Sequence, residues 1–230
     1  MSYQAPGYAA VARATVDTRA QFIVRTYNHL FGAIVLFALI EVVLFQTGVA
    51  QAIAMSLGRN WLFVLGGFMI ASWVGTHVAH TARSSAAQYA ALGGFVLAEA
   101  IIFVPLLYIA NAFAPGAIQS AALVTILGFA GLTAVVLKTR KDFSFLGGIL
   151  RWAFIVAMVL IVAGVVFGFQ LGTFFSVAMV GLAGAAILYD TSNVLHHYPE
   201  DRYVGAALQL FASVALMFWY VLRLFLASRD

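Results

Sequence analysis

The chain has 230 residues, of which 64% are hydrophobic and only 9% are charged, and its mean hydropathy is +1.01. About a quarter of the residues of a soluble domain are charged, so this composition excludes a soluble domain and indicates a multi-pass membrane protein. The formal net charge of +4 is typical of basic cytoplasmic loops, and we do not expect nucleic acid as a partner.

A polar segment precedes a series of apolar ones along the chain. Residues 1–25 lack the pattern of a cleaved signal peptide and are expected to form a cytoplasmic N-terminal tail, followed by one membrane domain over residues 26–230. Apolar stretches of roughly 20 residues, enough to cross a hydrocarbon core of about 30 Å, predict seven transmembrane helices. We expect them near 30–50, 61–80, 88–110, 117–137, 146–168, 171–190 and 204–226.

The distribution of basic residues predicts how these helices are oriented. With the N-terminus inside, nine of the twelve Lys and Arg residues fall on the cytoplasmic side, among them those of the loop 138–141. Arg59, Arg223 and Arg229 fall on the outer side. We therefore expect the N-terminus in the cytoplasm and the C-terminus outside.

Three acidic residues, Glu41, Glu99 and Asp190, lie inside predicted spans. A charge within the bilayer is costly unless it is paired or hydrated, so such residues are typical of ion sites. A rise of about 1.5 Å per residue places Glu41 and Glu99 at one level, each roughly 16 Å into its span. Asp190 falls near the cytoplasmic face, where Arg151 is its expected charge partner. Alternatively, Glu41 and Glu99 are neutral packing residues and Asp190 is a hydrogen-bonding residue at a helix end.

We expect neither an enzyme nor a metal or cofactor site. The histidines near the cytoplasmic span ends occur as two pairs, but no metalloprotease motif is present. Tyr189-Asp190 resembles half of an intramembrane aspartyl protease site, yet the last predicted span has no carboxylate. No serine nucleophile with a nearby base is evident either, and no catalytic residue is assigned.

Three stretches of the sequence resemble one known family. TRKDFSFLGG, residues 139–148, resembles the loop after the fourth span of the Bax inhibitor-1 (transmembrane Bax inhibitor motif) family, which includes a bacterial YccA-like branch. AAILYDT, residues 185–191, resembles the Tyr-Asp-Thr motif of its sixth span. AALQLF at 206–211 and LRLF at 222–225 resemble its last span.

This resemblance implies an all-helical bundle of seven transmembrane helices, with the last helix enclosed by the other six. It also implies a pH-sensitive calcium leak, in which the Asp of the sixth span shares a proton with a second Asp in the last span. Asp190 matches the first Asp, but ungapped matching from Ala206 puts Ser213 at the position of the second. Either Glu41 or Glu99 replaces the missing acid, or the chain does not gate calcium in this way.

We therefore expect a membrane protein that conducts Ca²⁺ or protons past Asp190, with Ser213, Glu41 and Glu99 as the other residues of the ion pathway or pH sensor. The alternative is a non-transporting regulator that binds another membrane protein, such as an AAA protease, through the N-terminal tail and the loop 138–141. In either case we expect a multi-pass protein of the lipid bilayer, and the lack of targeting signals and tail motifs favours the bacterial inner membrane.

Overall fold

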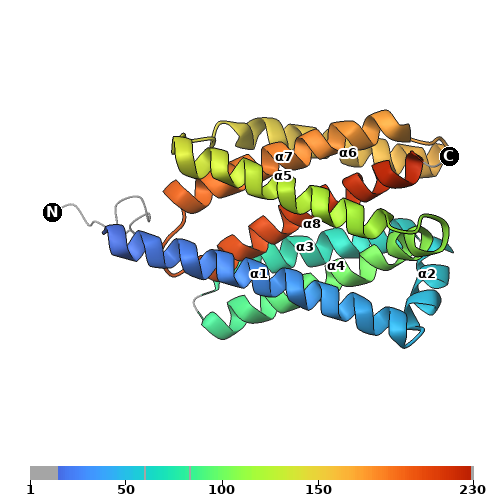
Figure 1. The fold of residues 1–230 in the computed structure, drawn as a ribbon, viewed down its shortest axis with the longest axis horizontal. Helices are drawn as coiled ribbons and strands as arrows, with labels where there is room; N and C mark the ends of the chain where they lie inside the picture. The colour runs from blue at the N-terminus through green and yellow to red at the C-terminus, as the bar shows by residue number, and fades with distance from the viewer. Residues whose placement is uncertain (1–14, 60, 83, 229–230) are drawn as a thin grey trace.

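A computed structural model of the chain describes residues 15–59, 61–82 and 84–228, and these residues form eight helices without an extended strand (Figure 1). The helices are α1 (Val16–Gln46), α2 (Val49–Arg59), α3 (Trp61–Thr81), α4 (Ser85–Phe113), α5 (Ala117–Thr139), α6 (Leu146–Phe167), α7 (Gly172–His196) and α8 (Tyr203–Ala227). All except α2 and α3 are long and apolar enough to cross a membrane, whereas α3 contains a shorter apolar segment, Val64–Val78. The expected all-helical membrane fold is confirmed, with six such helices rather than seven in the described part of the chain.

The first helix differs most from its expected bounds. It begins at Val16 after Thr15, whose side-chain oxygen accepts a hydrogen bond from the backbone N–H of Thr18, so residues 16–25 of the expected N-terminal tail are helical. It ends at Gln46, because Gly48 adopts a left-handed backbone with φ of 77°. The apolar run expected near 30–50 is therefore divided between α1 and the short helix α2.

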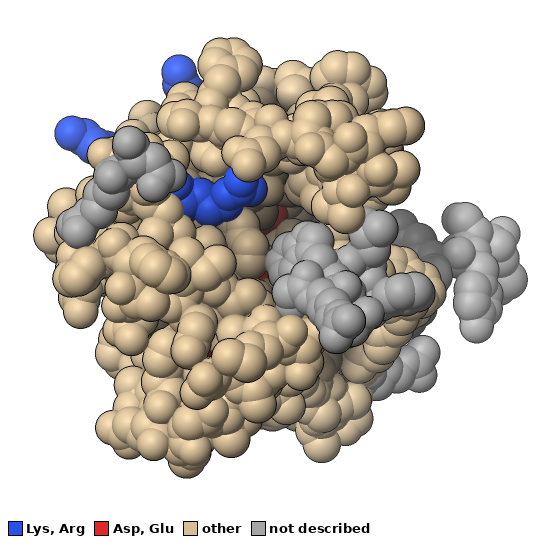
Figure 2. Space-filling view, turned by 90° about the vertical axis from the view of Figure 1, so that its right-hand side faces the viewer, with Lys and Arg blue, Asp and Glu red and all other residues tan. Residues whose placement is uncertain are grey.

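The two ends of the bundle differ in their basic residues. The start of α1, the α5–α6 loop and the α7–α8 loop lie at one end, and α2 and the C-terminal end of α8 lie at the other (Figure 1). The latter end shows mostly uncharged surface (Figure 2). The described basic residues of the first end are Arg19, Arg25, Lys138, Arg140, Lys141, Arg151 and Arg202. Arg13, Arg83, Arg229 and the side chain of Arg59 lie outside the described part.

Helix α8 occupies the centre of the bundle. It packs against α1, α3, α4, α5 and α7, whereas α6 lies outside and packs mainly against α7. Small residues allow this close packing: a Cβ atom at Gly128 of α5 would lie 3.3 Å from Met217 Sδ, and one at Gly184 of α7 would lie 3.7 Å from Met217 Cε. The last helix is thus surrounded by five helices, and α6 forms an outer layer.

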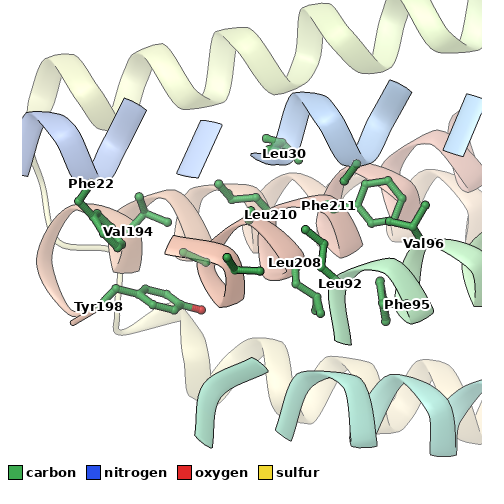
Figure 3. Packing of buried hydrophobic residues seen from close by; sticks show 14 residues of the cluster. Phe22, Leu30, Leu92, Phe95, Val96, Val194, Tyr198, Leu208, Leu210 and Phe211 are labelled. Carbon is green, nitrogen blue, oxygen red and sulfur yellow. The ribbon is translucent and has the colours of Figure 1, made fainter. Parts of the chain in front are cut away.

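One apolar cluster holds α1, α4 and the first half of α8 together (Figure 3). Phe95 of α4 meets Phe211 of α8 edge to face, with ring centroids 6.1 Å apart. Phe22 near the start of α1 packs beside Tyr198, which follows α7. This cluster anchors the half of α8 that precedes Ser213 and so fixes the position of that side chain.

Candidate functional site

Asp190 and Ser213 meet at the interface between α7 and α8. The Ser213 hydroxyl donates a hydrogen bond of 2.5 Å to Asp190 Oδ2. Both residues are buried, with 2% and 5% of their surfaces exposed. Gln209, one turn earlier on α8, also interacts with this carboxylate. The structure therefore brings Asp190 together with Ser213, the residue that the resemblance put at the position of a second Asp.

A cavity of about 1210 Å³ leads to this contact, and its walls come from α3, α4, α6, α7 and α8. Viewed from the end that carries the C-terminus, acidic surface is visible deep in a hollow and basic side chains lie beside it (Figure 2). The ionisable residues that line the cavity include Glu99, Asp190, Arg151 and Arg223. Two of the three intramembrane acids thus share one internal space.

Glu99 and Glu41 have different surroundings although both are buried. Glu99 of α4 is 7% exposed and lines the cavity, and no hydrogen bond or ion pair joins it to another described side chain. Glu41 of α1 is also 7% exposed, but neither of its carboxyl oxygens has a hydrogen-bond partner, and Glu41 does not line this cavity. The structure brings Glu99, but not Glu41, to the space in front of Asp190.

Arg151 lies on the first turns of α6 with its side chain exposed. No ion pair within 4.0 Å joins it to Asp190, although both residues line the same cavity. The carboxylate of Asp190 faces α8 and already accepts a hydrogen bond from Ser213, whereas α6 packs on the outer side of α7. The expected direct pairing is therefore absent from this conformation.

A polar cluster that we did not predict ties the α5–α6 loop to the end of α7. Asp142 Oδ2 lies 3.0 Å from His197 Nε2, and Asp142 Oδ1 accepts hydrogen bonds from Ser192 Oγ at 3.3 Å and from the backbone N–H of Ser144 at 2.8 Å. Ser192 Oγ also accepts a hydrogen bond of 2.8 Å from the backbone N–H of Phe143. The N–H of Ser144 is the main cause that lowers the pKa of Asp142 to about 2, and His197 adds to this shift.

Part of this cluster was visible in the sequence. Asp142-Phe143-Ser144 is typical of a turn in which a carboxylate accepts a hydrogen bond from the backbone two residues later. The contact with His197 spans 55 residues and has no local pattern. Asp142 directly follows the basic loop 138–141, so the cluster ties the chain just after this loop to the end of α7.

Comparisons with known proteins agree with the family resemblance seen in the sequence. The model of the family described as "Inhibitor of apoptosis-promoting Bax1" matches residues 19–230. An uncharacterized protein of Pseudomonas aeruginosa is 38% identical over 111 residues, which cover 47% of this chain and 49% of the relative. The "Modulator of FtsH protease YccA" of Escherichia coli K12 is 36% identical over 108 residues, which cover 46% of this chain and 49% of the relative.

A eukaryotic relative is also similar. "Bax inhibitor 1" of Schizosaccharomyces pombe is 30% identical over 141 residues, which cover 59% of this chain and 48% of the relative. With each of these relatives, the match spans about half of the relative's length.

Proposed function

The chain belongs to the Bax inhibitor-1 family of membrane proteins, and from this membership we propose that it lets cations leak across the membrane past Asp190. The observation that carries the proposal is that Glu99 and Asp190 line one large cavity inside the bundle. Carboxylates inside a membrane protein are retained where they face water or ions, and oxygen ligands suit Ca²⁺. Glu99 and Asp190 are therefore the acids of the proposed route, and Glu41 lies apart from it.

The present conformation is closed at Asp190. Its carboxyl group accepts a hydrogen bond from Ser213. The next turn of α7 contains Thr191 and Val194, which are at most 1% exposed. A cation would pass toward the α7–α8 loop only when α7 and α8 separate at this contact. In this proposal, the hydrogen bond between Asp190 and Ser213 keeps the ion pathway closed.

The orientation proposed for the protein places α3 across the membrane as a seventh span. The basic residues at the end that carries the α5–α6 loop then face the cytoplasm, and the C-terminus faces outward. A bacterial inner membrane is the proposed location, in keeping with the relative named "Inner membrane protein YccA" in Escherichia coli O6:H1.

Ion flux tests the leak directly. Purified protein is reconstituted into liposomes that contain a Ca²⁺ indicator, and Asp190→Asn and Glu99→Gln are compared with the unchanged chain. We expect both variants to lower the initial Ca²⁺ flux, and we expect Glu200→Gln, which removes an exposed acid outside the cavity, to leave it unchanged. Equal flux in Asp190→Asn and the unchanged chain would exclude this route.

A second function is regulation of a membrane protease. It is favoured by the relative named as a modulator of the FtsH protease, and by the exposed basic side chains Lys138, Arg140 and Lys141, which directly precede Asp142 in the chain. Degradation of a test substrate by a reconstituted FtsH-type protease should change when the chain is added. Replacement of these three basic residues by Gln should abolish that effect, whereas Asp190→Asn should not.

A further inference from the structure

The large cavity is flanked by two helices that do not pack against each other. α3 packs on α4 and α8, whereas α6 packs on α7, and no packed interface joins α3 to α6 over the described residues. Side chains of both helices nevertheless line the cavity, among them Met69 and Trp73 of α3 and Phe154 of α6. Met69 and Trp73 are 45% and 69% exposed, as residues at a lateral opening would be. The cavity therefore faces the bilayer between α3 and α6.

The residues that line the cavity suit an amphiphilic ligand, with one charged end and one apolar end. Its volume of about 1210 Å³ exceeds the roughly 300–1,000 Å³ of pockets that hold drug-sized ligands, so a cation alone leaves most of it unfilled. Most of the wall is apolar, and the acids Asp190 and Glu99 are deep within it. Among the charged residues that line the cavity, Arg151 is the exposed one. No hydrogen bond, ion pair or ring contact joins its guanidinium to another described side chain.

We propose that the cavity binds one anionic phospholipid from the bilayer, with an acyl chain between α3 and α6 and the phosphate on Arg151. A guanidinium pairs with phosphate through two parallel hydrogen bonds, and an arginine on the first turns of α6 lies at the level of lipid head groups when the rest of that helix is in the membrane. Arg223, at the other end of the cavity, already lies over the ring of Tyr220 at 5.8 Å. The assignment does not depend on the proposed leak.

The position of Trp219 provides a probe of this site. Trp219 of α8 lines the cavity, whereas Trp152 of α6 is 68% exposed and does not line it. α6 and α8 begin at the same end of the bundle, and a rise of about 1.5 Å per residue places Trp219 roughly 16 Å beyond Arg151 along the membrane normal. An acyl chain fills half of a hydrocarbon core of about 30 Å, so a chain anchored at Arg151 comes close to Trp219.

Quenching of tryptophan fluorescence by bromine-labelled lipids tests the proposal. Two single-tryptophan chains are made from the four tryptophans, one with Trp219 and one with Trp152, by replacing the others with Phe. Each is reconstituted with increasing amounts of dibrominated phosphatidylglycerol or dibrominated phosphatidylcholine. For Trp219 we expect half-maximal quenching at a roughly tenfold lower fraction of the anionic lipid. Both lipids offer a phosphate to Arg151, but phosphatidylcholine also carries a quaternary ammonium, which offsets the phosphate charge and repels the guanidinium, whereas the glycerol head group is uncharged. For Trp152 we expect equal quenching by both lipids.

Variants locate the head group. Arg151→Gln should remove the preference at Trp219 for the anionic lipid, whereas Lys138→Gln, which removes a basic residue at the same end of the bundle but outside the cavity, should preserve it. Ser72→Phe, which adds a ring to the α3 wall, should reduce quenching of Trp219 by both lipids. The proposal is overturned if Trp219 is quenched equally by both lipids, if it is not quenched at all, or if Arg223→Gln rather than Arg151→Gln removes the preference.

Discussion

Ser213 on α8 donates its hydroxyl hydrogen to Asp190 Oδ2 on α7, at a donor–acceptor distance of 2.5 Å and with both residues almost fully buried. A serine hydroxyl satisfies a buried carboxyl oxygen but brings no charge of its own. The contact therefore joins two helices without the second titrating group that the resemblance to the family implied. Both the stability and the pH response of the protein should follow from this exchange of a carboxyl for a hydroxyl.

Ser213→Ala should destabilise the bundle. The substitution leaves Asp190 without its closest donor, and an unsatisfied buried polar group costs about 1–3 kcal/mol in the free energy of unfolding. Denaturant unfolding in detergent micelles, followed by circular dichroism, measures this difference. Ser176→Ala is the matched control, because Ser176 is also buried but bonds only to the backbone of Gly172 at 3.5 Å. Equal losses for the two variants would show that the contact with Asp190 contributes nothing specific.

Ser213→Asp should make ion flux depend more steeply on pH. Two carboxyl groups in contact cannot both ionise easily, so their protons bind and dissociate as a coupled pair, whereas Ser213 does not titrate in this range. We expect a shallow change of Ca²⁺ flux between pH 6 and 8 for the unchanged chain and a steeper one for the variant. Proteoliposome flux at several pH values measures the slope.

Ser176→Asp is the matched control for this experiment. It adds a carboxyl group to the same cavity but lies 14 residues before Asp190 on α7, so the two acids are roughly 21 Å apart along the helix. Its slope should equal that of the unchanged chain. If the unchanged chain already responds steeply and Ser213→Asp has no effect, the coupled acids lie elsewhere, with Glu99 the first to test.

Cysteine labelling should distinguish the two ends of the bundle. The chain has no native Cys, so Thr139→Cys at the end of α5 and Phe167→Cys at the end of α6 each introduce a single thiol. Both positions are exposed. An impermeant maleimide added to intact cells should label Phe167→Cys alone, because the basic residues near Thr139 favour the cytoplasm. External labelling of Thr139→Cys would reverse the proposed orientation.

The helical fold class and the contact between Asp190 and Ser213 could both be predicted from the sequence. Apolar length predicts helices in a membrane, and the matched stretches on α7 and α8 placed Asp190 and Ser213 at paired positions. The break between α1 and α2 was missed, because the predicted span continued across Gln46-Thr47-Gly48 to residue 50. A glycine just after the last helical turn is typical of a helix end, and the left-handed backbone of Gly48 ends α1 here. Mean hydropathy over a window of span length does not register such a short break.

The side of a helix on which a residue lies was harder to predict than its depth. Arg151 and Asp190 were both placed near one face of the membrane, but depth does not determine the direction in which a side chain points around its helix. Asp190 points to α8, and Arg151 is exposed on α6. The pair between Asp142 and His197 depends in the same way on how a loop folds onto a helix end 55 residues later.

The cluster around Asp142 should make the α5–α6 loop sensitive to strong acid. The pKa of Asp142 is lowered from an ordinary value of 3.8 to about 2, chiefly by the N–H of Ser144 and further by His197. A lowered folded-state pKa means that the carboxylate contributes its full stabilisation above about pH 4 and loses it as the pH falls through 2. The side chain of Asp142 is 46% exposed, so solvent screens the interaction and the effect should be confined to the loop.

An environment-sensitive fluorophore at Phe145→Cys reports on this loop, because Phe145 is 66% exposed and three residues from Asp142. We expect its anisotropy to be constant from pH 7 to about pH 4 and to fall between about pH 4 and 2, as protonation of Asp142 releases Ser144 and His197. Asp142→Asn should show low anisotropy at every pH in this range, because a neutral amide holds these partners less strongly. Asp201→Asn, which removes an exposed acid from the neighbouring α7–α8 loop, should retain the pH response. A label that responds to acid equally in Asp142→Asn and in the unchanged chain would show that another group holds the loop.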